Sequence, residues 1–181
     1  MQGAVWGYLS ISGGVVTPPV LGSRATHLRT GMGGLDGRTL RADDHLPLGN
    51  CSDGIARRLV LPFRRYHRPI AVVSGPQEDY FSVEARHLLR TAQFEVSVDR
   101  DRMAMMLDGP FIHAQKGHDI VSDGTVIGSI QMPSSGRLVV LMADCQKTAG
   151  FPKIATVASW EISRLAQMPS RAKVRFRYCL H

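Results

Sequence analysis

The sequence has few cysteines, no long apolar run and no leader-like start, and each absence argues against a class of protein. Three cysteines among 181 residues, Cys51, Cys145 and Cys179, are widely spaced and form no C-x-x-C pair, which argues against a disulfide framework or a structural zinc site. No stretch approaches the roughly 18 apolar residues of a membrane span, and the start lacks the basic and apolar regions of a signal peptide. We therefore expect a cytoplasmic protein without a membrane partner.

Phosphate-binding loops are missing as well. The stretch TGMGGLDGRTLRADD has Gly31 and Gly33 in a G-x-G spacing, but Asp36 stands where the dinucleotide fingerprint needs its third glycine. No Gly-Lys-Ser/Thr follows, so we interpret the glycines as tight turns with positive φ. The pair Ser170-x-x-Lys173 lies between a proline and an alternating strand, and we do not interpret it as a nucleophile with its base.

A metal site finds little support. His113, His118, Asp119 and Asp123 carry ligand atoms, but a spacing of five between the histidines fits neither one face of a helix nor the alternation of a strand. We therefore predict no bound metal.

Acidic residues are outnumbered, with 15 Asp and Glu against 22 Lys and Arg and a formal net charge of +7. Such a balance is typical of proteins that bind nucleic acids. The clustered charges, however, lie in IARRLVLPFRRYHRP, a proline-punctuated connector, and in KVRFRY, where they alternate with apolar residues. Alternation of period two predicts the solvated face of an edge strand, so we predict no nucleic-acid partner.

What the sequence does contain is a series of short strands in a chain that is 44% apolar and 20% charged. β-Branched or alternating runs between turn signals predict strands at 5–11, 70–74, 94–98, 126–132, 137–143, 153–158 and 173–178. Two short helices are predicted, SVEARHLLRTA with Ser82 as N-cap and SWEISRLAQ with Ser159 as N-cap. The fold class is mainly β, a β-rich α+β protein.

The longest strand pair flanks a Pro-Ser-Ser-Gly turn in SIQMPSSGRLVVLMADCQKTAGFPKIATV. Pairing through this turn places Gln131 and Asp144 in one sheet, and the second strand ends in a dense polar string, Asp144 to Thr148. Strand ends that feed loops commonly display binding groups, so we interpret this string as the rim of a site.

Several motifs in order along the chain carry a resemblance to a known family. These are GGVVTPPVLGSRATHLRTGMGGLDGRTLRADDHLPLG, SGPQEDYF, DRMAMMLDGP, HDIVSDGTVIGSIQMPSSGRLVVLMADCQKTAGFPKIATV, and RLAQ ahead of VRF. The sequence resembles the allophanate hydrolase subunit 2 family, which includes the C subunit of 5-oxoprolinase, the KipA proteins and a carboxyltransferase domain of urea carboxylase.

The resemblance implies a cyclophilin-like β-barrel lobe preceded by a partial β lobe. It places residues 1–50 as the closing part of a first lobe, residues 51–69 as a connector and residues 70–181 as a second, complete lobe. In the family, about a third of the chain precedes the segment matching VWGYLSISGGVVTPPVLGSR, so we expect the opening strands of the first lobe to be missing here. Strand edges left unpaired in this way invite aggregation or a partner.

The resemblance also implies a small amide or urea substrate. We expect the C subunit of an ATP-dependent 5-oxoprolinase, an amidohydrolase that acts on a cyclic amide together with the A and B subunits of 5-oxoprolinase. Two alternatives stay open: a biotin-dependent carboxyltransferase, with biotin as carboxyl carrier, and a non-enzymatic KipA-like regulator that binds a KipI-like partner.

Both reactions develop negative charge on an amide-like oxygen, which fixed cations and amide donors stabilise. The resemblance therefore implies these site residues: Arg102, Asp144 and Lys153 as catalytic groups, and Gln131, Gln146, Thr148 and Ser122 as substrate-binding groups. The alternative is that Asp144 and Gln146 only cap turns while Arg102 pairs with a nearby carboxylate.

The family motif and this sequence differ at the same rim. Where the family usually has Asp-Arg-Gln-Thr-Thr-Gly-Gly-Tyr-Pro-Lys, this chain departs at Cys145, Lys147, Ala149 and Phe151. Met106 stands where a basic residue is usual, and Ala104 where glycine is usual. Two positive charges are lost and Lys147 restores one, so we expect reduced activity.

Overall fold

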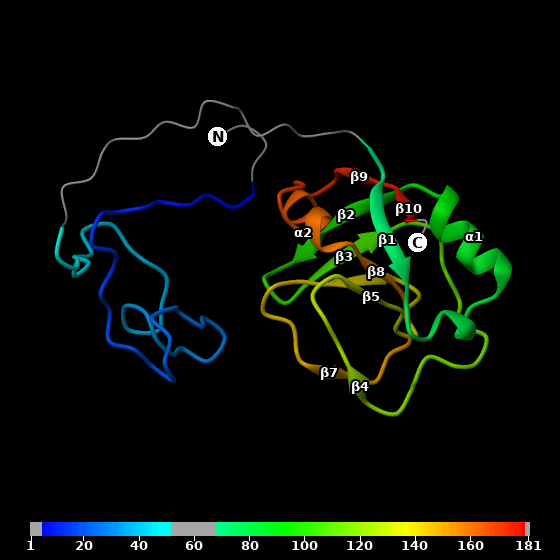
Figure 1. Ribbon diagram of the computed structural model, residues 1–181, viewed down its shortest axis with the longest axis horizontal. Helices are drawn as coiled ribbons and strands as arrows, with labels where there is room; N and C mark the ends of the chain where they lie inside the picture. Colours follow the sequence, from blue (N-terminus) through cyan, green and yellow to red (C-terminus); the bar gives the residue numbers. More distant parts are fainter. Residues whose placement is uncertain (1–4, 52–67, 180–181) are drawn as a thin grey trace. The chain divides into compact units, whose positions relative to one another are not determined.

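The computed structural model describes residues 5–51 and 68–179 (Figure 1). Most of the predicted connector, residues 52–67, lies outside the described residues, and with it the basic cluster except for Arg68. Within the described ranges, no helix is both long and apolar enough to cross a membrane.

The chain forms two compact units. One is Tyr8–Phe63, and the other combines Met1–Gly7 with Arg64–His181. Every helix and strand of the described residues belongs to the second unit: β1 (Ile70–Ser74), the 3-10 turn η1 (Glu78–Tyr80), α1 (Val83–Thr91), β2 (Phe94–Arg100), β3 (Ala104–Asp108), β4 (Asp123–Gly124), β5 (Ser129–Gln131), β6 (Leu138–Leu141), β7 (Thr148–Ala149), β8 (Lys153–Val157), α2 (Ser159–Ala166), β9 (Lys173–Val174) and β10 (Phe176–Tyr178).

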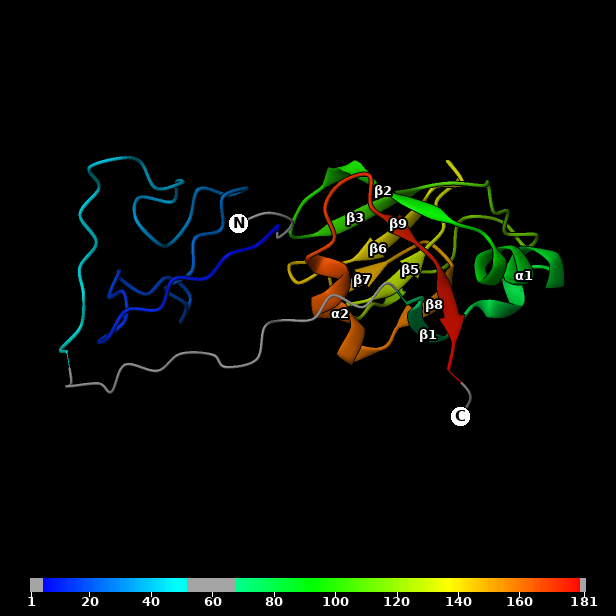
Figure 2. The same ribbon diagram turned by 90° about the horizontal axis from the view of Figure 1, so that it is seen from above.

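Eight strands form one sheet in the order β10-β1-β8-β5-β6-β3-β2-β9. The two outermost strands, β9 and β10, are separated by Arg175 alone, so one short segment pairs with β2 on one side and with β1 on the other. The sheet therefore curls into a nearly closed barrel, as the two orthogonal views show (Figures 1 and 2). Closure also removes the edges at which a sheet would pair with other chains.

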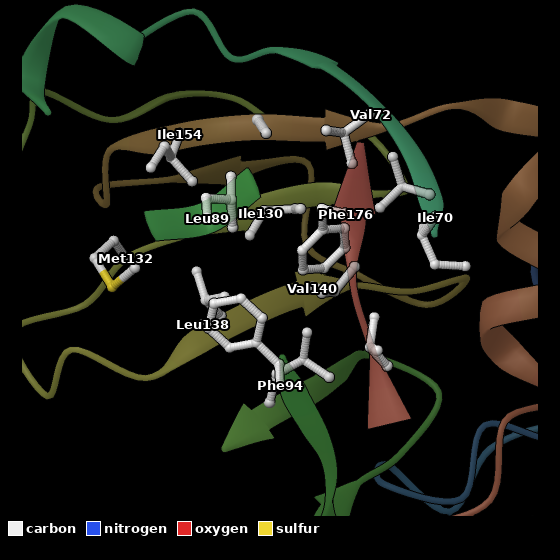
Figure 3. Close-up of a cluster of buried hydrophobic side chains, with 14 of the residues drawn as sticks. Ile70, Val72, Leu89, Phe94, Ile130, Met132, Leu138, Val140, Ile154 and Phe176 are labelled. Carbon is white, nitrogen blue, oxygen red and sulfur yellow. The ribbon is translucent and has the colours of Figure 1, made fainter. Parts of the chain in front are cut away.

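Apolar side chains from all sides of the barrel meet in its interior. Figure 3 shows those of Ile130 and Val140 pointing toward side chains from other strands and toward Leu89 of α1. The rings of Phe94 and Phe176 lie 5.8 Å apart between centroids and are tilted by 52°. Each of these side chains is at most 2% exposed. Buried and exposed residues alternate along the strands because successive side chains of a pleated strand point to opposite faces.

The two helices lie where the sequence predicts them. Ser82 caps α1, because its hydroxyl oxygen accepts a hydrogen bond from the Ala85 N–H at 3.0 Å. The predicted cap of the second helix is wrong: Ala158 occupies the N-cap, and Ser159 is already the first helical residue. The single residue between β8 and the helix is Ala158, which has no side-chain oxygen to accept a hydrogen bond, so this helix has no side-chain cap.

Two strand predictions need correction. Residues 5–11 form no strand; instead Val5 and Trp6 donate their backbone N–H groups to Gln167 Oε1, at 2.9 Å each. Residues 173–178 are not one edge strand but the two short strands β9 and β10 that close the barrel. Their alternation is nevertheless observed, with Val174 and Phe176 buried and the intervening Arg175 exposed. Strand β3 was missed, because its Ala-Met-Met-Leu core lacks β-branched residues.

The described part of the other unit, residues 8–51, holds turns and isolated bridges such as Val15 with Leu48, and no strand of its own. Its glycines at 31, 33, 34 and 37 have positive φ, which confirms the prediction of tight turns there. Arg38 donates to both carboxylate oxygens of Asp44 at 2.7 and 2.8 Å. None of the buried apolar side chains of the described residues comes from this unit.

Candidate functional site

The predicted hairpin through the Pro-Ser-Ser-Gly turn is observed. Strands β5 and β6 pair with Gln131 opposite Val139, and the Gly136 N–H closes the turn on the Pro133 carbonyl at 2.9 Å. Gly136 has φ of +69°, and a Cβ there would lie 1.7 Å from the ring of Phe111, so only glycine fits. The hairpin therefore places Gln131 before the turn and leads β6 into the polar string.

Asp144, shortly after the end of β6, contacts Arg102, shortly before the start of β3. The Arg102 side chain donates to both carboxylate oxygens of Asp144, at 2.6 and 2.8 Å, and the Asp144 N–H donates to the Arg102 carbonyl at 2.8 Å. The arginine side chain is 59% exposed and the carboxylate 32% exposed. The structure thus gives Arg102 the carboxylate partner that the structural alternative requires, on a surface open to solvent.

Lys153 takes part in a second, more buried group at the start of β8. Its ammonium donates to Asp123 Oδ2 at 2.9 Å, while its side chain is 2% exposed and that of Asp123 is 48% exposed. Gln77 completes the group: its Nε2 donates to Asp123 Oδ2 at 3.0 Å, and its Oε1 accepts the Lys153 N–H at 3.2 Å. Asp123 is thus the solvent-facing member and Lys153 the enclosed one.

These contacts set the charge state of the group. The hydrogen bond from Lys153, followed by those from Gln77 and the Gly124 N–H, lowers the pKa of Asp123 from 3.8 to about 2. Asp123 is therefore a carboxylate at neutral pH.

A glycine allows this group to form. Gly75 comes directly after β1, and its backbone lies close to that of β8. A Cβ atom at position 75 would lie 2.1 Å from the Lys153 carbonyl oxygen. The Gly75 N–H donates to the Ile154 carbonyl at 3.0 Å, and the Gln77 N–H donates to that of Lys153 at 3.3 Å. Close approach of the two backbones brings the Gln77 side chain within reach of Asp123, and any larger residue at position 75 would prevent it.

Gln131 lies beside Lys153, because the two residues are register partners across β5 and β8. The register of the two strands shifts by one residue between Ile130 and Gln131, so the pairing at Gln131 is irregular. Gln131 is 2% exposed, and its Nε2 has no hydrogen-bond partner among the described residues. A buried amide donor without a partner is rare and costly, and an ordered water or a ligand oxygen would satisfy it.

The remaining predicted site residues lie on the ribbon formed by β4 and β7. Thr148 pairs with Gly124, next to Asp123, and is exposed. Gln146 is exposed, and its carbonyl oxygen accepts a hydrogen bond from the Thr125 hydroxyl. Ser122 is exposed on the segment that enters β4. The ribbon thus brings Thr148 next to Asp123, and it leaves the Gln146 and Ser122 side chains facing solvent.

Sequence reasoning did not assign Gln77 to the site and considered Asp123 only as a metal ligand. The signal for Gln77 was its place in SGPQEDYF, after a glycine whose backbone must approach another strand closely. For the described residues, no group of three or more His, Cys, Asp and Glu side chains is arranged to hold a metal ion. The rings of His113 and His118 lie 6.0 Å apart between centroids.

The departures from the family motif have different surroundings. Cys145 is 7% exposed, directly after Asp144, whereas Met106 on β3 is partly exposed opposite Val139. A basic side chain at position 106 would reach solvent, but one at position 145 would have to leave a buried position. The two positions are therefore not equivalent places to restore charge.

A family model described as "Carboxyltransferase domain, subdomain A and B" matches residues 1–178. The chain belongs to this family. It is 31% identical over 172 residues to the C subunit of 5-oxoprolinase from Escherichia coli (strain K12), a match that covers 95% of this chain and 56% of the relative. The corresponding 5-oxoprolinase component of Haemophilus influenzae is 32% identical over 178 residues, covering 95% of this chain and 55% of the relative. The chain thus spans about half the length of these relatives.

More distant relatives share the domain. The urea amidolyase of Lachancea kluyveri is 26% identical over 198 residues, which cover 93% of this chain and 10% of that protein. Among solved structures, TTHA0988 superposes with a TM-score of 0.77 at 30% identity, over 91% of this chain and 31% of that one. The urea amidolyase of K. lactis superposes with a TM-score of 0.78 at 23% identity, and the match covers 92% of this chain and 12% of that one. The structural likenesses confirm the mainly β fold class, and the family model confirms the predicted family.

Proposed function

We propose that this domain is the C component of a 5-oxoprolinase-type amidohydrolase, which opens a cyclic amide with ATP in a complex with the A and B subunits. The two 5-oxoprolinase relatives, at 31 and 32% identity over 95% of this chain, support this branch of the family over the others. The observation that carries the site is the buried donor pair formed by Lys153 and Gln131.

Lys153 and Gln131 each have N–H groups that the described contacts leave without an acceptor. An ammonium has three N–H donors, and the described residues give that of Lys153 one acceptor, Asp123. The Gln131 amide contributes a donor with no partner in the described part of the chain. Attack on an amide carbonyl places negative charge on its oxygen, and preorganised donors in a site shielded from water stabilise that charge strongly.

The burial of Lys153 and Gln131 means that a substrate cannot reach them without a movement of the protein. Lys153 and Gln131 are 1% and 2% exposed, so a substrate oxygen reaches them only after the covering segment moves. The ribbon of β4 and β7 carries Asp123, the acceptor that holds Lys153, and each of its strands is two residues long. Displacement of this ribbon would exchange the Asp123 carboxylate for the substrate oxygen. Asp123 then acts as a positioning residue for Lys153.

Arg102 and Asp144 serve in this proposal as the outer, solvent-facing part of the site. Their two-fold hydrogen bond fixes the guanidinium in one orientation just before the start of β3. An anionic substrate or an acidic protein partner would compete with Asp144 for this guanidinium. Ser122, Gln146 and Thr148 expose polar side chains on the adjoining ribbon.

The test is reconstitution with the A and B subunits of a relative, in a strain that lacks its own C subunit, with glutamate release from 5-oxoproline as the readout. We expect ATP-dependent turnover with all three components and none from the purified chain alone, because the described site contains no evident nucleophile. Lys153→Met should abolish turnover, while Lys116→Met, at an exposed lysine paired with Asp79, should retain it. Ring opening by the isolated chain would overturn the proposal.

A biotin-dependent carboxyltransferase is the second candidate. The similarity to urea amidolyase and to a putative urea carboxylase of Emericella nidulans, both at 26% identity, favours it. The same donor pair would then stabilise the oxygen of a urea or of the ureido ring of biotin. Copurification separates the candidates, since a biotinylated protein would accompany the chain in this case and the A and B subunits of 5-oxoprolinase in the other. A KipI-like protein as the sole partner would instead indicate a regulator.

A further inference from the structure

A second polar cluster lies beside α2 and β9 and shares no residue with the candidate site. A cavity of about 610 Å³ opens there, lined by Arg68, Pro69, Gln93, Arg164, Gln167, Met168, Pro169, Ala172, Lys173 and Arg175. In Figure 1, α2 and β9 lie toward the top of the barrel as drawn, and β4 and β7 of the candidate site lie at its bottom. The cavity is therefore separate from the predicted chemistry.

The lining of this cavity is rich in cations. Its lining contains four cationic side chains and no carboxylate among the described residues. Glu161, which is not part of the lining, forms ion pairs with Arg164 at 2.6 Å and with Arg68 at 3.6 Å. Lys173 forms an ion pair with Glu95. Among these cations, Arg175 is the one for which the described contacts include no carboxylate.

Arg175 is the cation with the weakest internal partner. The one side-chain partner that the described part of the chain gives it is the amide oxygen of Gln93, at 3.3 Å. A neutral amide neither cancels the charge of a guanidinium nor uses its donors, of which there are five. Arg175 also lies at a fixed place, between the two strands that close the barrel.

The rest of the cavity wall is rigid and largely apolar. Arg164 is 12% exposed and donates to the Arg68 and Pro69 carbonyls at 2.7 and 3.0 Å, which ties α2 to the start of β1. Met168 and Ala172 pack partly against the barrel core and supply apolar surface to the lining. Such a wall suits an apolar body and holds the cations in place around it.

We propose that this cavity binds a small organic anion, a carboxylate on a short apolar body, with Arg175 as its principal charge partner. The apolar body lies on Met168 and Ala172. The volume falls in the range of about 300–1,000 Å³ that is typical of small-molecule sites, which favours such a ligand over an acidic segment of another protein. The proposal is independent of the amidohydrolase function.

Isothermal titration calorimetry of the full chain with hexanoate at low ionic strength tests it. We expect saturable binding with a dissociation constant of about 1 mM, which is reasonable for a ligand of this size. Arg175→Gln should weaken binding about tenfold or more, because it removes a charge-assisted hydrogen bond. The matched control is Arg177→Gln, two residues along the same segment and also exposed but absent from the cavity lining, which should bind like the parent. Circular dichroism confirms that both variants fold.

Five outcomes would overturn the proposal. Hexanamide binding as tightly as hexanoate would show that charge plays no part, and inorganic phosphate binding as tightly would show that the apolar wall plays none. Equal losses in Arg175→Gln and Arg177→Gln would reveal only general attraction to a basic surface. A glutamate-rich peptide binding more tightly than hexanoate, or no saturable binding by any of these probes, would likewise reject a small-anion site.

Discussion

Replacing Gln131 by methionine should make the domain more stable and less active. The two side chains have similar length and volume, so the exchange leaves the packing between β5 and β8 largely intact. It removes an amide whose Nε2 is buried without a partner among the described residues, beside the enclosed Lys153. Buried polar groups of this kind are tolerated where function requires them.

The size of the effect follows from burial. Gln131 is 2% exposed, so water does not compensate its donor, and an unsatisfied buried group costs about 1–3 kcal/mol. Allowing for imperfect packing of the thioether, we expect the free energy of unfolding to rise by about 1 kcal/mol. In the reconstituted enzyme, loss of a donor to the substrate oxygen should lower turnover by about 100-fold.

Urea unfolding followed by circular dichroism measures the first effect, with an unchanged m-value as the sign that the same surface is exposed. Gln115→Met is the matched control, because Gln115 is exposed and its stability change should stay within about 0.5 kcal/mol. A destabilisation of more than about 1 kcal/mol by Gln131→Met would refute the reasoning, since it would show that the amide already has a partner. A more stable variant with full turnover would refute its catalytic role alone.

Four further predictions concern charge. Asp123→Asn should lower the melting temperature at neutral pH, and parent and variant should converge as the pH falls from about 4 to about 2, because the pKa of Asp123 is lowered from 3.8 to about 2. Cys145→Arg should cost about 2 kcal/mol or more in urea unfolding, because position 145 is 7% exposed. Arg102→Met should cost less than about 1 kcal/mol in the same assay, because its pair with Asp144 is open to solvent. In filter binding, retention of single-stranded RNA should collapse between about 50 and 200 mM salt; tight, sequence-selective binding there would contradict the strand-face interpretation.

The alternation and turn signals of the sequence predicted most of the barrel, because they report on one face of one strand at a time. The Pro-Ser-Ser-Gly hairpin and the cap at Ser82 are local features, and both are observed. Closure of the barrel is not local: it depends on β9 and β10 pairing with strands far away in sequence. Nothing within KVRFRY distinguishes an edge strand from a segment that joins two edges.

One part of the candidate site could be predicted from the sequence, and the other part could not. Sequence reasoning named the pairing of Arg102 with a carboxylate as an alternative, because an exposed arginine commonly pairs with a nearby carboxylate, and the pair with Asp144 is observed. The group around Lys153 was not, because it joins residues 30 and 76 positions apart through a close approach of two backbones. A sequence shows which residues can donate or accept, but burial decides which of them lack a partner.

Other buried polar atoms of this barrel, in Arg137 and Glu161, also lack a partner among the described residues, but they belong to groups whose charge is compensated. Arg137 has a buried Nε without a partner among the described residues, yet its Nη2 donates to Asp108 and Ser97 at 2.7 and 2.9 Å, so its charge is well compensated. Glu161 likewise leaves Oε1 without a hydrogen bond in the described ranges, while Oε2 accepts from Arg164 at 2.6 Å. The Nε2 of Gln131, by contrast, is buried without a hydrogen-bond partner among the described residues, at the position paired with Lys153. The ammonium of Lys153 has an acceptor in Asp123, so Gln131 is the group for which the proposed substrate oxygen would supply the missing acceptor.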